Sequence, residues 1–231
     1  MSTYILDWIA PQYCVLCGLR IHGQQRAVSG PLCKSCANNL PPSPLLRCRF
    51  CGTELFGEDE ICYTCRNRTH SYEEVFPLFR YRDAPATLIR SYKMSQRKSL
   101  ASFWANLVYE VLQQRWPEYV VVPVPPRPEK IKTHEWDQVE AIATRLEKRG
   151  VPVVRPLVRM ASEEQKSLGR EGRKANASKG YEYSPEYHCD APQLVVLFDD
   201  VYTTGATAEA CSRALLTNGT KKVAVLVLAM D

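Results

Sequence analysis

The fold is most clearly indicated by residues 195–207, VVLFDDVYTTGAT. The four leading apolar residues are typical of a buried strand in a parallel sheet. Two adjacent acids, Asp199 and Asp200, follow at the carboxyl end of that strand, and a Thr/Gly loop then turns directly into a helix. Ligands of open α/β sheets bind in the crevice beyond such strand ends. The stretch therefore predicts a ligand-binding strand, loop and helix within an α/β domain.

Strands and helices alternate on both sides of this stretch. The expected strands lie at 76–82, 119–125, 151–158, 194–198 and 223–229, and the expected helices at 84–94, 99–116, 134–149 and 206–218. Strands that are apolar on both faces and alternate with helices imply a parallel sheet with helices on both sides. The polar, basic stretch 165–183 predicts a long loop.

The turn after the two acids has the composition of a phosphate cradle. Its residues are Thr203, Thr204, Gly205, Ala206 and Thr207. In a turn that opens a helix, backbone N–H groups point at one spot and threonine hydroxyls add donors. Asp199 and Asp200 would repel a phosphate, so their expected partners are sugar hydroxyls and a hydrated Mg²⁺. Together these groups predict a site for a ribose 5-phosphate. The alternative is a strand end and a helix start that are merely capped.

The first 65 residues hold eight of the ten cysteines, in four C-x-x-C pairs. These cysteines are Cys14, Cys17, Cys33, Cys36, Cys48, Cys51, Cys62 and Cys65. Two residues between thiols let one tight turn present both sulfurs to Zn²⁺, and two such turns complete a closed structural site. We expect two structural zinc ions, with redox or disulfide pairs as the alternative. Sequential and interleaved pairing of the four motifs both stay open, because they use the same ligands.

Organisation and charge follow from the same patterns. Residues 1–70 lack the periodicity of a core and predict a double zinc ribbon, whereas 71–231 predict the α/β domain. Lys and Arg number 30 against 25 Asp and Glu, and most of the excess falls between Arg155 and Lys179, as an anionic ligand would favour. No apolar run approaches about 18 residues. We therefore expect a cytoplasmic protein without membrane insertion.

Four segments together resemble the ComF/GntX family of competence-type phosphoribosyltransferase-like proteins. They are YKM at 92–94 with Arg97-Lys98, VVPVP at 121–125, QKSLGR at 165–170 with RKAN at 173–176, and the stretch 199–207. The resemblance implies a type I phosphoribosyltransferase fold and a role in the uptake and processing of transforming single-stranded DNA. It implies phosphoribosyl pyrophosphate as ligand, with single-stranded DNA and a DNA-uptake helicase or other competence protein as partners.

Further residues are expected around such a site. The loop after 123–125 and Arg127 would face the pyrophosphate, and by resemblance Lys93 reaches the same group. Segment 165–179 suits a mobile hood that closes Lys166 and Arg170 over the anion. For each of these basic residues the alternative is a solvated surface charge.

One segment departs from the family pattern. The family shows Arg-Gly-Phe-Asn-Gln where this chain has HEWDQ at 134–138. Both the arginine and the glycine are lost, which puts turnover in doubt. Three functions stay open: an enzyme that transfers phosphoribose, a non-catalytic nucleotide or single-stranded-DNA binding module, and an adaptor that docks a DNA-handling partner through the zinc ribbon.

Overall fold

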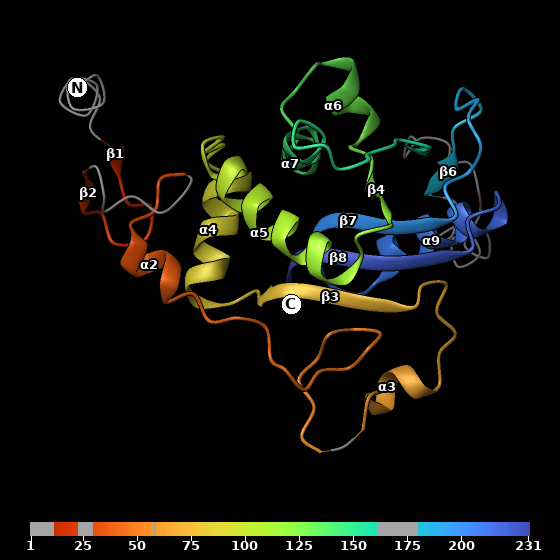
Figure 1. Cartoon of the computed structure of the whole chain (residues 1–231), viewed down its shortest axis with the longest axis horizontal. Helices are drawn as coiled ribbons and strands as arrows, with labels where there is room; N and C mark the ends of the chain where they lie inside the picture. Colours follow the sequence, from red (N-terminus) through yellow and green to blue (C-terminus); the bar gives the residue numbers. More distant parts are fainter. Residues whose placement is uncertain (1–11, 23–29, 58, 161–179) are drawn as a thin grey trace, which may run out of the picture.

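The computed structural model describes residues 12–22, 30–57, 59–160 and 180–231. At its centre lies a four-stranded sheet whose strands are all parallel, in the order β3-β8-β7-β4 (Figure 1). These strands are Glu74–Arg80 (β3), Lys222–Met230 (β8), Leu194–Tyr202 (β7) and Val120–Pro123 (β4). The two central strands, β7 and β8, are mostly buried because side chains on both of their faces meet helices.

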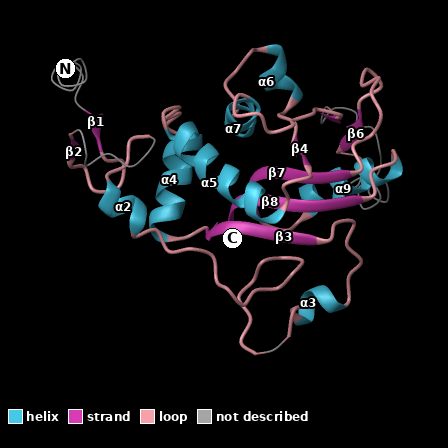
Figure 2. Ribbon diagram, viewed as in Figure 1, coloured by secondary structure: helices cyan, strands magenta, loops and turns pink. Residues whose placement is uncertain are grey.

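Helices cover both faces of this sheet (Figure 2). One face carries α4 (Asp83–Lys93), α5 (Leu100–Arg115) and α7 (Gln138–Glu147), which share a buried apolar cluster with Val196 and Phe198 of β7. The other face carries α9 (Ala206–Thr217), which packs with Val195 and Leu197. The predicted fold class is confirmed: an α/β parallel sheet of the type I phosphoribosyltransferase kind, preceded by cysteine-rich ribbons.

Two differences from the expected elements bear directly on the site. Strand β7 does not end at residue 198 but continues to Tyr202, because Asp199 pairs with Val227 of β8 and the ladder runs to the end of that strand. The two acids therefore lie within the strand. Helix α7 begins at Gln138, later than expected, because Asp137 Oδ1 accepts the amides of Val139 and Glu140 at 3.0 and 3.1 Å and caps the helix.

Smaller elements surround the carboxyl end of the sheet. Helix α6 (Pro128–Lys132) was not expected, and Pro128 occupies a first-turn position where its missing N–H costs nothing. Of the expected strand 151–158, only its end contributes to β5 (Leu157–Arg159), since Pro152 and Pro156 interrupt the ladder. β5 pairs antiparallel with β6 (Tyr181–Tyr183), in a stretch expected to be loop, and both contact α9.

Two cysteine-centred units precede the sheet. The first ribbon contains β1 (Gln12–Tyr13), β2 (Arg20–Ile21) and α2 (Lys34–Asn38) and lies beside α4 and α5 (Figure 1). The second ribbon contains α3 (Tyr63–Arg66) and lies along β3. The domain division into 1–70 and 71–231 stays a prediction. The structure adds that apolar residues of the first ribbon share one buried cluster with α5.

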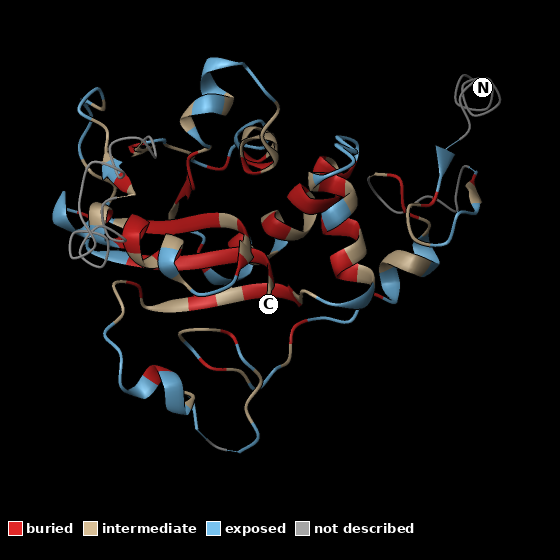
Figure 3. Ribbon diagram, turned by 180° about the vertical axis from the view of Figure 1, so that it is seen from behind, coloured by how far each residue is buried: buried red, intermediate tan, exposed pale blue. Residues whose placement is uncertain are grey.

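Burial is concentrated in the central strands and in the helix faces turned toward them (Figure 3). Across the four described ranges, no helix combines the length and apolarity needed to cross a membrane.

Candidate functional site

Each ribbon brings four cysteine sulfurs together. Within each set every Sγ lies within 4.8 Å of the others, and the sets are sequential: Cys14, Cys17, Cys33 and Cys36, then Cys48, Cys51, Cys62 and Cys65. One sulfur pair in the first set is 3.8 Å apart and one in the second is 3.7 Å. Two thiolates bound at about 2.3 Å to one tetrahedral Zn²⁺ lie about 3.8 Å apart. The two tetrads thus fit two structural zinc ions, paired in chain order.

One buried thiol in each tetrad favours the form that binds metal. Burial raises the pKa of the Cys14 and Cys48 thiols, but hydrogen bonds from neighbouring backbone amides outweigh it. The pKa of Cys14 is lowered to about 6 and that of Cys48 to about 7. Since the thiolate is the zinc ligand, the backbone amides around Cys14 and Cys48 stabilise the ligand state of that one thiol in each tetrad.

The turn between β7 and α9, residues 203–207, lies at the protein surface. Thr203, Thr204 and Ala206 are exposed. The amide of Ala206 points to Thr204 Oγ1 at 3.4 Å, a long contact that an incoming acceptor can replace. Amides in the first turn of a helix lack an intrahelical acceptor, and the helix dipole is positive there. The turn can therefore accept an anion.

The shape of this turn requires glycine at position 205. Gly205 has φ +78°, in the left-handed region, and a Cβ built there would lie 2.8 Å from Cζ of Tyr202. Any side chain at this position would push the turn away from the tyrosine ring below it. Gly205 thus lets the backbone of the turn pass close over the end of β7.

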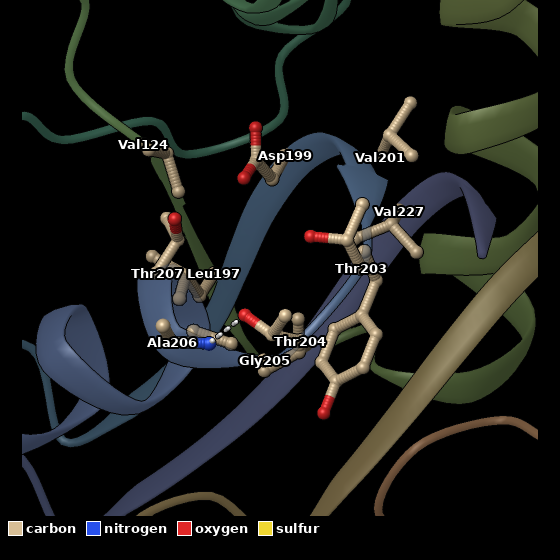
Figure 4. Close-up of a pocket in the computed structure, with 13 residues that line it drawn as sticks. Val124, Leu197, Asp199, Val201, Thr203, Thr204, Gly205, Ala206, Thr207 and Val227 are labelled. Atoms are coloured by element: carbon tan, nitrogen blue, oxygen red, sulfur yellow. Dashed lines mark hydrogen bonds between the residues drawn. The ribbon is translucent and has the colours of Figure 1, made fainter. Parts of the chain in front are cut away.

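Both acids reach one cavity beside the turn. Asp199 lines a small pocket together with residues 203–207 (Figure 4). It also lines an adjoining cavity of about 630 Å³ with Asp200, Thr203 and Thr207. Successive side chains of a strand point to opposite faces, so Asp199 approaches this cavity from the side of α9 and Asp200 from the side of α4 and α7. The carboxylates flank the end of the strand.

The two carboxyl groups differ in their surroundings. Burial, reinforced by the neighbouring charge of Asp200, raises the pKa of Asp199 to about 7. The amide of Asp200 donates to Asp199 Oδ1 at 2.8 Å. Asp200 itself is paired: its Oδ2 accepts Lys93 Nζ at 2.8 Å and Gln138 Nε2 at 2.7 Å. In this arrangement Asp199 is the carboxyl group that gains most from a bound cation.

The other expected residues are distributed unevenly. Lys93, at the end of α4, lines the cavity, and Arg127 lies on its rim with an exposed side chain. Lys166 and Arg170 fall in 161–179, outside the described residues.

The structure also brings in three residues that were not assigned to the site: Gln138, Lys130 and Arg159. Gln138 donates to Asp200, and Lys130 bonds both Asp137 Oδ2 and Gln138 Oε1 at 3.2 Å. The signal for Gln138 was available, because it is the unchanged last residue of the divergent segment 134–138. Arg159 belongs to the basic stretch that begins at Arg155, but nothing in its spacing separates it from surface charge.

Comparison with known proteins adds two findings. Residues 5–66 match the family model of the double zinc ribbon domain. Over 226 residues the chain is 23% identical to Competence protein F of Haemophilus influenzae, an alignment that covers 94% of this chain and 96% of that protein. The similarity therefore extends over the ribbons, the sheet and the turn together.

Proposed function

We propose that this chain, which belongs to the ComF family, binds phosphoribosyl pyrophosphate with Mg²⁺ and serves natural competence, the uptake and processing of transforming single-stranded DNA. The competence role is carried over from the name of the Haemophilus influenzae relative. The ligand is inferred from the site itself.

The observation that carries the ligand assignment is the meeting of the acid pair and the open turn at one cavity. Asp199 borders the turn 203–207 directly, and Asp200 faces the adjoining space. Donors for a phosphate and acceptors for sugar hydroxyls thus border the same space, as a ribose 5-phosphate requires. The volume, about 630 Å³, is within the range of small-molecule sites.

Each group then has a distinct part in binding. The amides and hydroxyls of residues 203–207 hold the 5-phosphate, and the acids accept the ribose hydroxyls. Their oxygen donors also suit Mg²⁺, which neutralises charge on the pyrophosphate when bound. Lys93 and Arg127 line the same cavity as Thr203 and Thr207, and in this proposal their positive charges bind the pyrophosphate.

If turnover occurs, its bond changes are simple. The bond between ribose C1 and the pyrophosphate oxygen breaks through a transition state with oxocarbenium character, as in glycoside chemistry. Pyrophosphate leaves with the electron pair, and an acceptor atom donates a pair to C1. The protein's contribution is to hold the anion, stabilise the leaving charge and exclude water.

Calorimetry with phosphoribosyl pyrophosphate and Mg²⁺ tests the assignment. We expect the Asp199→Asn/Asp200→Asn variant to bind at least about a hundredfold more weakly, because hydrogen bonds to charged groups contribute about 1.5–3 kcal/mol each. The matched control is Asp190→Asn, which changes an exposed acid outside the cavity. Equal affinity of wild type and the double variant would remove the proposed site.

A second candidate is a non-catalytic nucleotide or single-stranded-DNA binding adaptor that docks a partner through the ribbons. The observation in its favour is the exposure of large apolar side chains on and beside the second ribbon: Leu45 is 95%, Phe56 93% and Tyr63 83% exposed. Release of one pyrophosphate for each acceptor molecule that receives phosphoribose supports the enzyme. Tight binding without release, with DNA affinity that falls steeply with salt, supports the adaptor.

A further inference from the structure

Residues Ser71 and Tyr72 connect the second ribbon to β3 and are hydrogen-bonded to residues on either side of the 203–207 turn. Tyr202 is the last residue of β7, immediately before the turn, and Glu209 lies in the first part of α9, two residues after it. Both are hydrogen-bonded to this pair, which lies more than a hundred positions earlier in the sequence. We call Ser71 and Tyr72 the clamp.

The first contact joins the clamp to β7 and to the zinc ligands. The hydroxyls of Tyr72 and Tyr202 are 2.9 Å apart, and each lies 3.2 Å from the carbonyl oxygen of Phe50. Phe50 stands between the zinc-binding residues Cys48 and Cys51. Burial raises the pKa of Tyr202 to about 12, so its hydroxyl stays protonated as a donor. The same ring limits how far Gly205 can move toward β7.

The second contact joins the clamp to α9. The amide of Ser71 donates to Glu209 Oε2 at 2.9 Å, and its hydroxyl donates to Oε1 at 2.6 Å. Arg213 adds a third donor to Oε1 at 3.0 Å. Burial raises the pKa of Glu209, but these donors outweigh it and keep the pKa below its ordinary value. An ionised, two-oxygen contact fixes both the position and the orientation of the helix start.

Elsewhere the second ribbon and the turn are separated. A cavity of about 630 Å³ lies between them, lined on one side by Tyr63 and Arg68 and on the other by Thr203 and Thr204. Within the described part of the chain, the hydrogen bonds of the clamp act together with the direct bond from the Tyr202 hydroxyl to the Phe50 carbonyl to fix the turn relative to the ribbon.

We propose that Ser71 and Tyr72 are positioning residues for the 5-phosphate: anchored by the second zinc ribbon, they hold Tyr202 and Glu209 and so keep the amides of the turn in the anion-binding arrangement. A turn that is ordered before the ligand arrives does not lose conformational entropy on binding. This inference rests on the proposed function, because it concerns the same phosphate site.

The experiment separates the two ends of the ligand. Calorimetry measures the affinity of wild type, Tyr72→Phe, Ser71→Ala and the double variant for ribose 5-phosphate and, separately, for pyrophosphate with Mg²⁺. We expect each single variant to bind ribose 5-phosphate about three- to tenfold more weakly, as the loss of one hydrogen bond implies, and the double variant more than about tenfold. Pyrophosphate affinity and two zinc ions per chain should be unchanged.

Two matched variants complete the test. Ser71→Thr keeps the hydroxyl and should restore wild-type affinity, and Tyr119→Phe removes a hydroxyl outside the site and should have no effect. Failure of wild type to bind either ligand contradicts the proposed function itself. Wild-type binding that the double variant retains within about twofold, or an equal loss of affinity for both ligands, overturns the positioning role.

Discussion

The two zinc ribbons share one ligand pattern but are attached to the rest of the molecule in different ways. The first ribbon inserts side chains into the main core: Ile21, Leu32 and Leu40 are buried in one cluster with α5. The second ribbon is held along β3 by backbone hydrogen bonds, such as Val75 N to Arg49 O at 2.8 Å and Ser43 N to Leu78 O at 3.0 Å.

This difference separates two uses of the same metal motif. Apolar burial contributes about 25 cal/mol per Å² to stability, so the first ribbon supports the fold as a whole. The second ribbon exposes Phe56 and Tyr63 and packs the partly buried Phe50 against the sheet core; it contributes hydrogen-bonding groups, of which the Phe50 carbonyl reaches the tyrosines beneath the turn. We therefore expect damage to the first ribbon to lower stability, and damage to the second to weaken ligand binding.

The largest effects should come from substitution of the zinc ligands, because each ribbon depends on its own metal ion. Cys17→Ser and Cys51→Ser should each reduce the zinc content from two ions to one, because structural zinc contributes about 10–16 kcal/mol to such segments. Of the two variants, Cys17→Ser should lower the melting temperature more. Cys51→Ser should lower the affinity for ribose 5-phosphate more. Metal analysis, thermal unfolding and calorimetry measure the three quantities. The reverse pattern would show that the ribbons do not divide these roles.

The next effect concerns apolar burial. Leu32→Ala in the first ribbon empties a fully buried position and should cost about 2–5 kcal/mol in the free energy of unfolding. Phe56→Ala truncates a side chain of the second ribbon that is 93% exposed. It should change the free energy of unfolding by less than about 0.5 kcal/mol. Urea unfolding measures both. Similar costs for the two variants would mean that the Phe56 side chain has an apolar contact in solution.

Two glycines, one in each ribbon, have almost the same backbone conformation but different surroundings. Gly18 in the first ribbon has φ +72° and Gly52 in the second has φ +75°. A Cβ at Gly18 meets no atom within 4 Å, whereas one at Gly52 would lie 2.9 Å from Pro77 Cγ of β3. Gly18→Ala should lower the free energy of unfolding by about 1 kcal/mol, because only the backbone conformation becomes unfavourable. Gly52→Ala should lower it by about 1–3 kcal/mol more, because the added Cβ also overpacks against β3. Equal costs in urea unfolding would mean that the second ribbon can shift away from β3.

The smallest expected effect leaves both ribbons intact and tests the acid pair. The pKa of Asp199 is raised from 3.8 to about 7, mainly by burial. Its contribution to stability is therefore full below pH 3.8 and is lost as the pH rises through about 7. Asp199→Asn should accordingly raise the melting temperature by about 2–4 °C at pH 8 and leave it unchanged at pH 4. The variant should hold two zinc ions per chain at both pH values. A variant that is less stable than wild type at pH 8 would contradict the burial of this carboxyl.

The local features of the fold could be predicted from the sequence. The apolar run before Asp199, the Thr/Gly turn and the helix after it are contiguous, so their order in the chain is their order in space. The C-x-x-C spacing likewise predicts that two sulfurs approach one metal ion. The pairing of the motifs could not be predicted, because it depends on how the chain returns between Cys17 and Cys33.

The contacts that support the site depend on tertiary packing and could not be predicted in this way. Ser71 and Glu209 are 138 positions apart, and neither belongs to a recognisable motif. The continuation of β7 beyond residue 198 is set by its neighbour β8, which the local pattern of the strand does not contain. Gln138 reaches Asp200 because Asp137 starts α7 at that residue.

The ion pair between Lys93 and Asp200 has a consequence for the order of loading. A cation that takes up the Oδ2 oxygen of Asp200 must first displace the lysine ammonium, which lies 2.8 Å away. One positive charge then replaces another on the carboxylate, and the released ammonium is left to face the negative charge of the proposed ligand. We therefore expect the metal ion and the anionic ligand to bind together, and the metal ion to bind weakly in the absence of the anion.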